Sequence, residues 1–179
     1  MQKRLRWICL LLTAVLAMSG IGVTLAFMFR RAEQSSSLEA AAVSCELSEE
    51  FNDPVKSNIR VRNTGNIPAF IRIRVVSYWV KEDGSIVGHP AEYPTLDLLN
   101  DWWKSGSDEV YYYPTPVAPG HQTEVLCQPF ELSTTTDEHG VTLYLVVTLL
   151  AEAIQASPDS AAESAWGITV ESGMITDTP

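Results

Sequence analysis

Basic residues are scarce in most of this chain. Residues 32–179 contain all 22 acidic side chains but only seven of the 12 lysines and arginines, which gives that part a net charge of −15. Such a surface repels nucleic acid and anionic lipid headgroups, so neither is an expected partner. We interpret the acidity as a solvated surface. The sequence lacks the Asp-x-Asp-x-Asp-Gly loop by which clustered carboxylates bind calcium.

Motifs that carry catalysis are also missing. The three histidines, His89, His121 and His139, are dispersed, and we interpret the acidic turn at residues 136–139 as a chance cluster. A zinc protease needs His-Glu-x-x-His on a helix, and a serine hydrolase needs Gly-x-Ser-x-Gly after a strand. Neither pattern occurs, nor does a glycine-rich loop that cradles phosphate. We therefore predict no catalytic residue, no metal site and no cofactor.

The segment from residue 7 to residue 29 contains no charge and follows a basic N-terminus. As a helix its 23 residues would rise about 34 Å, enough to span the hydrocarbon of a bilayer. It is either a signal peptide cleaved after Ala26 or an uncleaved membrane anchor. In both cases the membrane is a partner of residues 7–29, at least before processing. We expect residues 32–179 outside the cytoplasmic membrane.

Cysteine is rare, with Cys9 inside the leader and only Cys45 and Cys127 after it. An even pair in an exported domain permits a disulfide between these two residues. Two buried free thiols are the equal alternative. No cysteine and histidine spacing indicates a metal site.

Amphipathic helical periodicity is almost absent beyond the leader, whereas short alternating runs recur between proline- and glycine-marked turns. The exceptions are a possible helical turn within residues 96–104 and a short helix at residues 160–165, capped by Asp159. We expect strands at residues 43–47, 55–63, 70–80, 85–87, 109–113, 123–127, 141–151 and 168–170.

This spacing predicts an all-β fold, an antiparallel β-sandwich of about seven strands and of jelly-roll or Ig-like type. An N-terminal signal or transmembrane helix, residues 1–29, precedes it. Residues 30–42 are a small, polar spacer, residues 43–172 form the sandwich, and residues 173–179 are a flexible tail.

Residues 141–151 are the most apolar run of the exported part. Leucines and valines fall on both faces of this expected strand rather than on one. Apolar residues on both faces are typical of a central strand that is covered on both sides.

Five aromatic residues lie close together in the sequence. They are Trp102, Trp103, Tyr111, Tyr112 and Tyr113. Alternation along a strand would place Tyr111 and Tyr113 on one face and Tyr112 on the other. The cluster either fills the core of the sandwich or forms an exposed platform that binds a glycan or a protein partner.

The run Asn63-Thr-Gly-Asn-Ile-Pro-Ala-Phe-Ile-Arg combines a turn with the start of a long strand. Asn63, Gly65, Asn66 and Pro68 supply residues that favour turns. The run resembles the signature of secreted Gram-positive proteins that are processed by the SipW-type signal peptidase, the TasA- and camelysin-like group. The leader pattern Gly22-Val-Thr-Leu-Ala-Phe27 is also similar to that group. So are the further segments Cys45–Phe51, Lys56–Arg62, Tyr111–Gly120, and Leu150–Ala156 followed by Ala165–Gly167.

The resemblance implies a jelly-roll-like domain exported to the surface of a Gram-positive bacterium, with a SipW-type signal peptidase as a partner. Some relatives form fibres by donating their N-terminal segment as a strand. Residues 31–42 are rich in Ser, Glu and Ala and form strands poorly. We therefore expect a non-enzymatic, minor or accessory surface or biofilm-matrix component, with self-association or other matrix proteins as partners. The alternative is a membrane-tethered module that binds glycan or protein through the aromatic cluster.

Overall fold

The computed structural model describes residues 40–88, 91–106 and 109–178. The expected leader, its cleavage position Ala26 and most of the spacer lie outside this part. Within the described ranges no helix is both long and apolar enough to cross a membrane.

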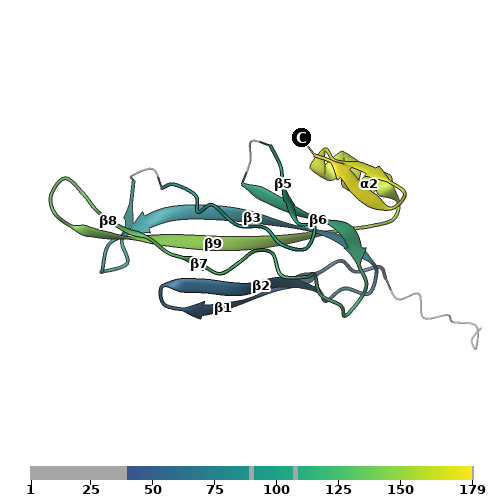
Figure 1. The fold of residues 1–179 in the computed structure, drawn as a ribbon. Coiled ribbons are helices and arrows are strands. Elements are labelled where there is room, and N and C mark those ends of the chain that lie inside the picture. Colours follow the sequence, from purple (N-terminus) through teal and green to yellow (C-terminus); the bar gives the residue numbers. More distant parts are fainter. Residues whose placement is uncertain (1–39, 89–90, 107–108, 179) are drawn as a thin grey trace, which may run out of the picture. The chain divides into compact units, whose positions relative to one another are not determined.

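The regular structure of the described chain is mostly antiparallel β-structure with one short helix, which confirms the all-β prediction (Figure 1). It contains eleven strands and one helix, α2 (Asp159–Trp166). The strands are β1 (Cys45–Asn52), β2 (Val55–Asn63), β3 (Ala69–Val80), β4 (Ile86–Val87), β5 (Trp103–Lys104), β6 (Val110–Val117), β7 (Phe130–Glu131), β8 (Thr134–Thr136), β9 (Thr142–Gln155), β10 (Thr169–Glu171) and β11 (Met174–Asp177).

The larger sheet is centred on the long pair β3 and β9. Its order is β5-β6-β3-β9-β8, with β4 paired to the end of β3. The pairing of β3 with β9 is unbroken from Ala69 opposite Gln155 to Val80 opposite Tyr144. Strands of this length form because both sequences are rich in β-branched and aromatic residues and contain no proline or glycine.

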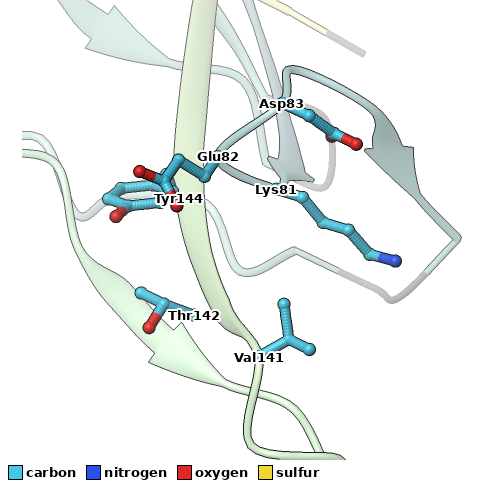
Figure 2. A pocket seen from close by; sticks show the side chains of 6 residues that line it. All are labelled: Lys81, Glu82, Asp83, Val141, Thr142 and Tyr144. Atoms are coloured by element: carbon cyan, nitrogen blue, oxygen red, sulfur yellow. The ribbon is translucent and has the colours of Figure 1, made fainter.

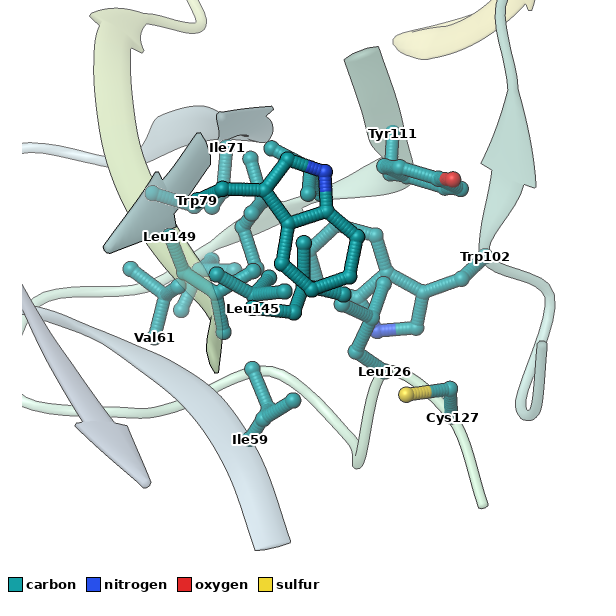
Figure 3. Packing of buried hydrophobic residues seen from close by; sticks show 14 of the residues in the cluster. Ile59, Val61, Ile71, Trp79, Trp102, Tyr111, Leu126, Cys127, Leu145 and Leu149 are labelled. Atoms are coloured by element: carbon teal, nitrogen blue, oxygen red, sulfur yellow. The ribbon is translucent and has the colours of Figure 1, made fainter. Parts of the chain in front are cut away.

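The smaller sheet has the order β1-β2-β7. Ile59 and Val61 of β2 are fully buried, and they share one apolar cluster with Ile71, Ile73 and other residues from the inner face of the larger sheet (Figure 3). The core therefore forms from alternate residues of both sheets, as a period of two requires.

The C-terminal segment packs against the opposite, outer face of the larger sheet. The helix α2 and the β10–β11 hairpin bury Trp166, Ile168 and Ile175 in a second cluster with Phe70 and Tyr112. We call residues 159–177 the C-terminal cap. Pro158, not Asp159, occupies the N-cap position of the helix, and Asp159 lies in its first turn.

The flexible tail predicted for residues 173–179 is wrong for most of its length. Met174–Asp177 forms β11, and Ile175 is 3% exposed. The error arose because a four-residue strand carries little periodic signal, and because its apolar partners lie on the cap and the sheet rather than nearby in sequence.

Three other local predictions differ from the structure. No helix forms at residues 96–104 and no strand at residues 123–127, where Cys127 makes an isolated bridge to Leu98. Conversely, β6 continues through Pro114 and Pro116, which we expected to end it. On one side of β6, the short strand β5 ends before it reaches either proline. On the other side, the pairing of β6 with β3 is irregular at this point. The missing N–H groups of the prolines therefore interrupt no regular series of hydrogen bonds.

Candidate functional site

The turn at Asn63 is held by the side chain of a fully buried asparagine. Its Nδ2 donates hydrogen bonds of 2.8 Å to the carbonyl oxygens of Ile67 and Val117. Its Oδ1 accepts one of 2.9 Å from the backbone N–H of Gly65. Because these bonds use both amide protons and the carbonyl oxygen, the buried side chain is satisfied and joins β2 to the end of β6.

The same turn also holds the segment that enters the domain. The N–H groups of Thr64 and Gly65 bond to the carbonyl oxygen of Ser44, and the N–H of Asn66 bonds to that of Ala42. In return the N–H of Ala42 donates to Oδ1 of Asn66 at 2.7 Å. Residues 42–44 are therefore fixed against the domain by backbone and side-chain bonds.

Gly65 is required where the two segments meet. A Cβ atom at this position would lie 2.3 Å from the carbonyl oxygen of Ala42, far inside van der Waals contact. The glycine thus permits a close backbone approach. The Asn63–Asn66 run fixes the start of the domain, and it offers no group for acid, base or nucleophilic chemistry.

The five aromatic residues do not form an exposed platform. Trp102, Tyr111 and Tyr112 are 4%, 2% and 2% exposed, while Trp103 and Tyr113 are half-buried. The platform alternative is therefore wrong for these residues. The predicted alternation is confirmed, since Tyr111 and Tyr113 pack in the inner core and Tyr112 packs beneath the C-terminal cap.

Hydrogen bonds and ring contacts explain the burial of these polar aromatic side chains. Trp102 donates its indole N–H to the carbonyl oxygen of Glu124, and the hydroxyl of Tyr111 donates to Glu109 at 3.0 Å. Burial and the neighbouring Glu109 both raise the pKa of Tyr111 above its ordinary value. Such partners are typical of structural aromatic residues rather than of a ligand platform.

Arg72 is a cluster centre that the sequence pattern did not reveal. Its Nε donates to Glu152 Oε2 at 2.8 Å, Nη2 also contacts that oxygen, and Nη1 lies 3.3 Å from the Tyr112 hydroxyl. The guanidinium also lies against the Trp166 ring. In the sequence Arg72 alternates with Ile71 and Ile73, a pattern that by itself would place it on the solvent side of a half-buried strand. The apolar residues on both faces of residues 141–151 were the one sequence signal that another element covers the outer face of the sheet.

Both cysteines of the described chain are free thiols. Burial raises the pKa of Cys127 to about 11. Burial, and then the charge of Glu152, raise the pKa of Cys45. A raised pKa leaves little thiolate at neutral pH, so neither residue is suited to act as a nucleophile. The disulfide permitted by the sequence is not formed in the structure.

The histidines of the described chain are exposed. His121 lies beside the carbonyl oxygen of Pro119, and His139 is on the turn that follows β8; His89 lies outside the described residues. Asp137 accepts hydrogen bonds from the N–H groups of Val141 and His139, which lower the pKa of its carboxyl. Across residues 40–88, 91–106 and 109–178, no three His, Cys, Asp or Glu side chains are grouped to hold a metal ion.

A hollow of 480 Å³ lies where β3 ends and β9 begins (Figure 2). Its lining includes Tyr144 and the charged turn residues Lys81, Glu82 and Asp83. Asp83 accepts hydrogen bonds from the side chain and the backbone N–H of Ser85, which lower the pKa of its carboxyl. The hollow is therefore lined by mixed charge and one exposed tyrosine.

The chain matches no protein-family model, no curated protein and no solved structure.

Proposed function

We propose that this protein is a non-enzymatic component of a cell surface or extracellular matrix, exported by its N-terminal leader and built on a β-sandwich. The supporting observation is the bonding of residues 42–44 to the Asn63–Asn66 turn. This bonding fixes the point at which the domain meets the spacer that links it to the leader. A fixed start of this kind is compatible with a folded domain that is carried on a polar spacer.

The distribution of buried polar groups favours a structural role. The groups that the sequence singled out, namely the aromatic cluster and both cysteines, are engaged in packing or have a raised pKa. The resemblance to SipW-dependent proteins adds the export route, the Gram-positive host and the signal peptidase as partner. A glycan-binding role for the aromatic cluster is not proposed, because its members are buried or half-buried.

Fractionation of the producing cells tests the export proposal. We expect the chain in the medium, the matrix or the outer face of the membrane, and we expect protease added to intact cells to degrade it. Mass spectrometry of its N-terminus then separates the two interpretations of the leader, because cleavage after Ala26 gives a chain that begins at Phe27. Recovery of the chain in the cytoplasm, protected from protease, would contradict the proposal.

Electron microscopy of the exported protein tests the accessory role. We expect no ordered filaments at neutral pH, because residues 31–42 are a poor donor strand. Filaments formed by the protein alone would instead make it a principal fibre subunit.

A further inference from the structure

The outer face of the larger sheet is apolar beyond the C-terminal cap. Residues directly opposite each other on paired strands point to the same side, so Ile86, Val80 and Tyr144 form one row across β4, β3 and β9. Tyr78 and Val146 form the next row. We define the outer apolar face as Val76, Tyr78, Val80, Ile86, Tyr144, Val146, Thr148 and Leu150.

Three members of this face are strongly exposed. Ile86 is 71% exposed, Leu150 46% and Tyr144 41%, whereas the other five are half-buried by their neighbours on the sheet. The C-terminal cap covers only the far end of the same sheet face, around Phe70 and Tyr112. A contiguous uncharged patch on an otherwise acidic domain indicates an interaction surface.

Charged residues of both signs border the face at each end. Arg74 lies directly opposite Leu150 on the paired strand, and it is 3.8 Å from Glu152. At the other end Lys81 and Glu82 line the hollow that contains Tyr144 (Figure 2). Along an extended strand, positions 74 and 81 are about 23 Å apart.

We propose that this face binds the same face of a second copy of the chain, with the two sheets related by a two-fold axis and their β3 strands antiparallel. In that arrangement Arg74 of each copy meets Glu82 of the other. An uncharged centre allows two acidic domains to approach without burying like charges. An isologous interface needs a self-complementary surface, which opposite charges at the two ends provide.

The size of the face sets the expected strength of the dimer. Three strands across and seven residues along give about 330 Å² per copy, or roughly 660 Å² in total, from the spacing of strands and residues. This is below the roughly 1,000 Å² that a stable, specific interface buries, and it falls in the range of transient contacts. The dimer is therefore weak and reversible, and it does not depend on the proposed surface role.

Photo-cross-linking tests the contact. The full chain is produced with benzoylphenylalanine in place of Tyr144, exported and irradiated, using a mixture of light and isotopically heavy copies. We expect a product of twice the chain's mass that contains both isotopic forms. Tyr93 is the matched control, because it is 46% exposed but lies outside the face. No dimer from position 144, a product with a different protein only, or equal dimer from position 93 would overturn the proposal.

Charge reversal tests the antiparallel arrangement. We expect Arg74→Glu and Glu82→Arg to weaken dimerisation of the exported protein about tenfold each, because each places like charges opposite one another. The double variant restores opposite charges and returns the dissociation constant to about the wild-type value. Analytical ultracentrifugation gives the constants, and circular dichroism confirms that each variant is folded. If the double variant dimerises no more tightly than the single variants, this arrangement is contradicted.

Discussion

The guanidinium carbon of Arg72 lies 4.5 Å from the centroid of the Trp166 indole ring. Arg72 belongs to β3 and Trp166 ends α2, so the contact joins the C-terminal cap to the outer face of the sheet. The arginine side chain is 14% exposed there and is paired with Glu152 on the adjacent strand. A charge at this depth is tolerated because a carboxylate and an aromatic face both meet it.

Replacement of Arg72 should therefore destabilise the domain. We expect Arg72→Met to lower the free energy of unfolding by about 2–3 kcal/mol, because Glu152 and the Tyr112 hydroxyl lose their buried partner. The free energy of unfolding of Arg72→Lys should lie between those of the wild type and Arg72→Met, since an ammonium group keeps the charge but cannot stack on the indole ring as a planar guanidinium does.

Urea unfolding monitored by circular dichroism measures this effect. Arg74→Met is the matched control on the same strand, because Arg74 is 42% exposed and lies 3.8 Å from Glu152. We expect its effect to stay below about 0.5 kcal/mol, as for other exposed pairs. If Arg72→Met lowers the free energy of unfolding no more than Arg74→Met does, the stability of the cap does not depend on Arg72.

A second prediction concerns the buried amide of Asn63. Asn63→Asp keeps the size of the side chain but replaces the donor that faces the carbonyl oxygens of Ile67 and Val117. We expect the free energy of unfolding to fall by about 3 kcal/mol or more, because two buried carbonyl oxygens lose their hydrogen-bond donor and a carboxylate is buried in its place. Asn100→Asp is the control, because it removes one exposed bond to Val125. Similar unfolding free energies for both variants would contradict this role.

The close approach at Gly65 gives a third prediction. Gly65→Ala should displace residues 42–44, because its Cβ would lie 2.3 Å from the Ala42 carbonyl oxygen. We expect faster amide exchange at Thr64, Gly65 and Asn66, whose N–H groups bond to that segment.

Limited proteolysis provides an independent measurement of the same change. The Gly65→Ala variant should be cleaved within residues 40–44 more rapidly than the wild-type chain. Gly88→Ala is the control, since nothing lies within 4 Å of its added methyl group. Unchanged protection in the Gly65 variant would mean that the turn does not hold the entering segment.

The sequence predicted the interior of the long strands well because alternation is a local pattern, although β9 continues to Gln155, four residues beyond the expected end. Val55–Asn63 forms as expected, and the expected strand at residues 70–80 differs by one residue from Ala69–Val80. Alternation also separated Tyr112 from its two neighbours correctly. It could not show what covers each face, because burial depends on elements distant in sequence. Tyr112 is therefore buried by Trp166 rather than exposed to a ligand.

The candidate sites were predicted less well for the same reason. Whether Cys45 and Cys127 form a disulfide depends on the distance between β1 and the segment between β6 and β7. The amino-acid composition gives no information about that distance. Asn63 was recognised as a turn residue, but its bond to Val117 joins positions 54 residues apart. Local turn propensity cannot indicate such a long-range contact.

The thiol of Cys127 leads to a prediction about alkaline pH. Burial raises its pKa from 9.0 to about 11. Between these values the unfolded chain loses its thiol proton while the folded chain keeps it, so the stability that this group contributes is present below pH 9 and is lost as the pH rises to about 11.

We expect the free energy of unfolding to fall over this range, and to fall less in a Cys127→Ala variant. The difference between the two curves isolates Cys127 from Tyr111, whose raised pKa acts in the same direction. Parallel curves for wild type and variant would show that the thiol is not buried in the folded state.

The C-terminal hairpin provides the last prediction, because it was expected to be a flexible tail. Ile175 is 3% exposed and packs in the cluster beneath the cap, whereas its neighbour Met174 is 44% exposed. Ile175→Ala should lower the free energy of unfolding by about 2–4 kcal/mol through lost burial and a cavity, and Met174→Ala by less than about 1 kcal/mol. Because the two residues are adjacent, any effect of a frayed terminus would act on both equally. A large difference in denaturant midpoint therefore establishes that residues 174–177 belong to the folded domain, and equal midpoints would restore the tail predicted from the sequence.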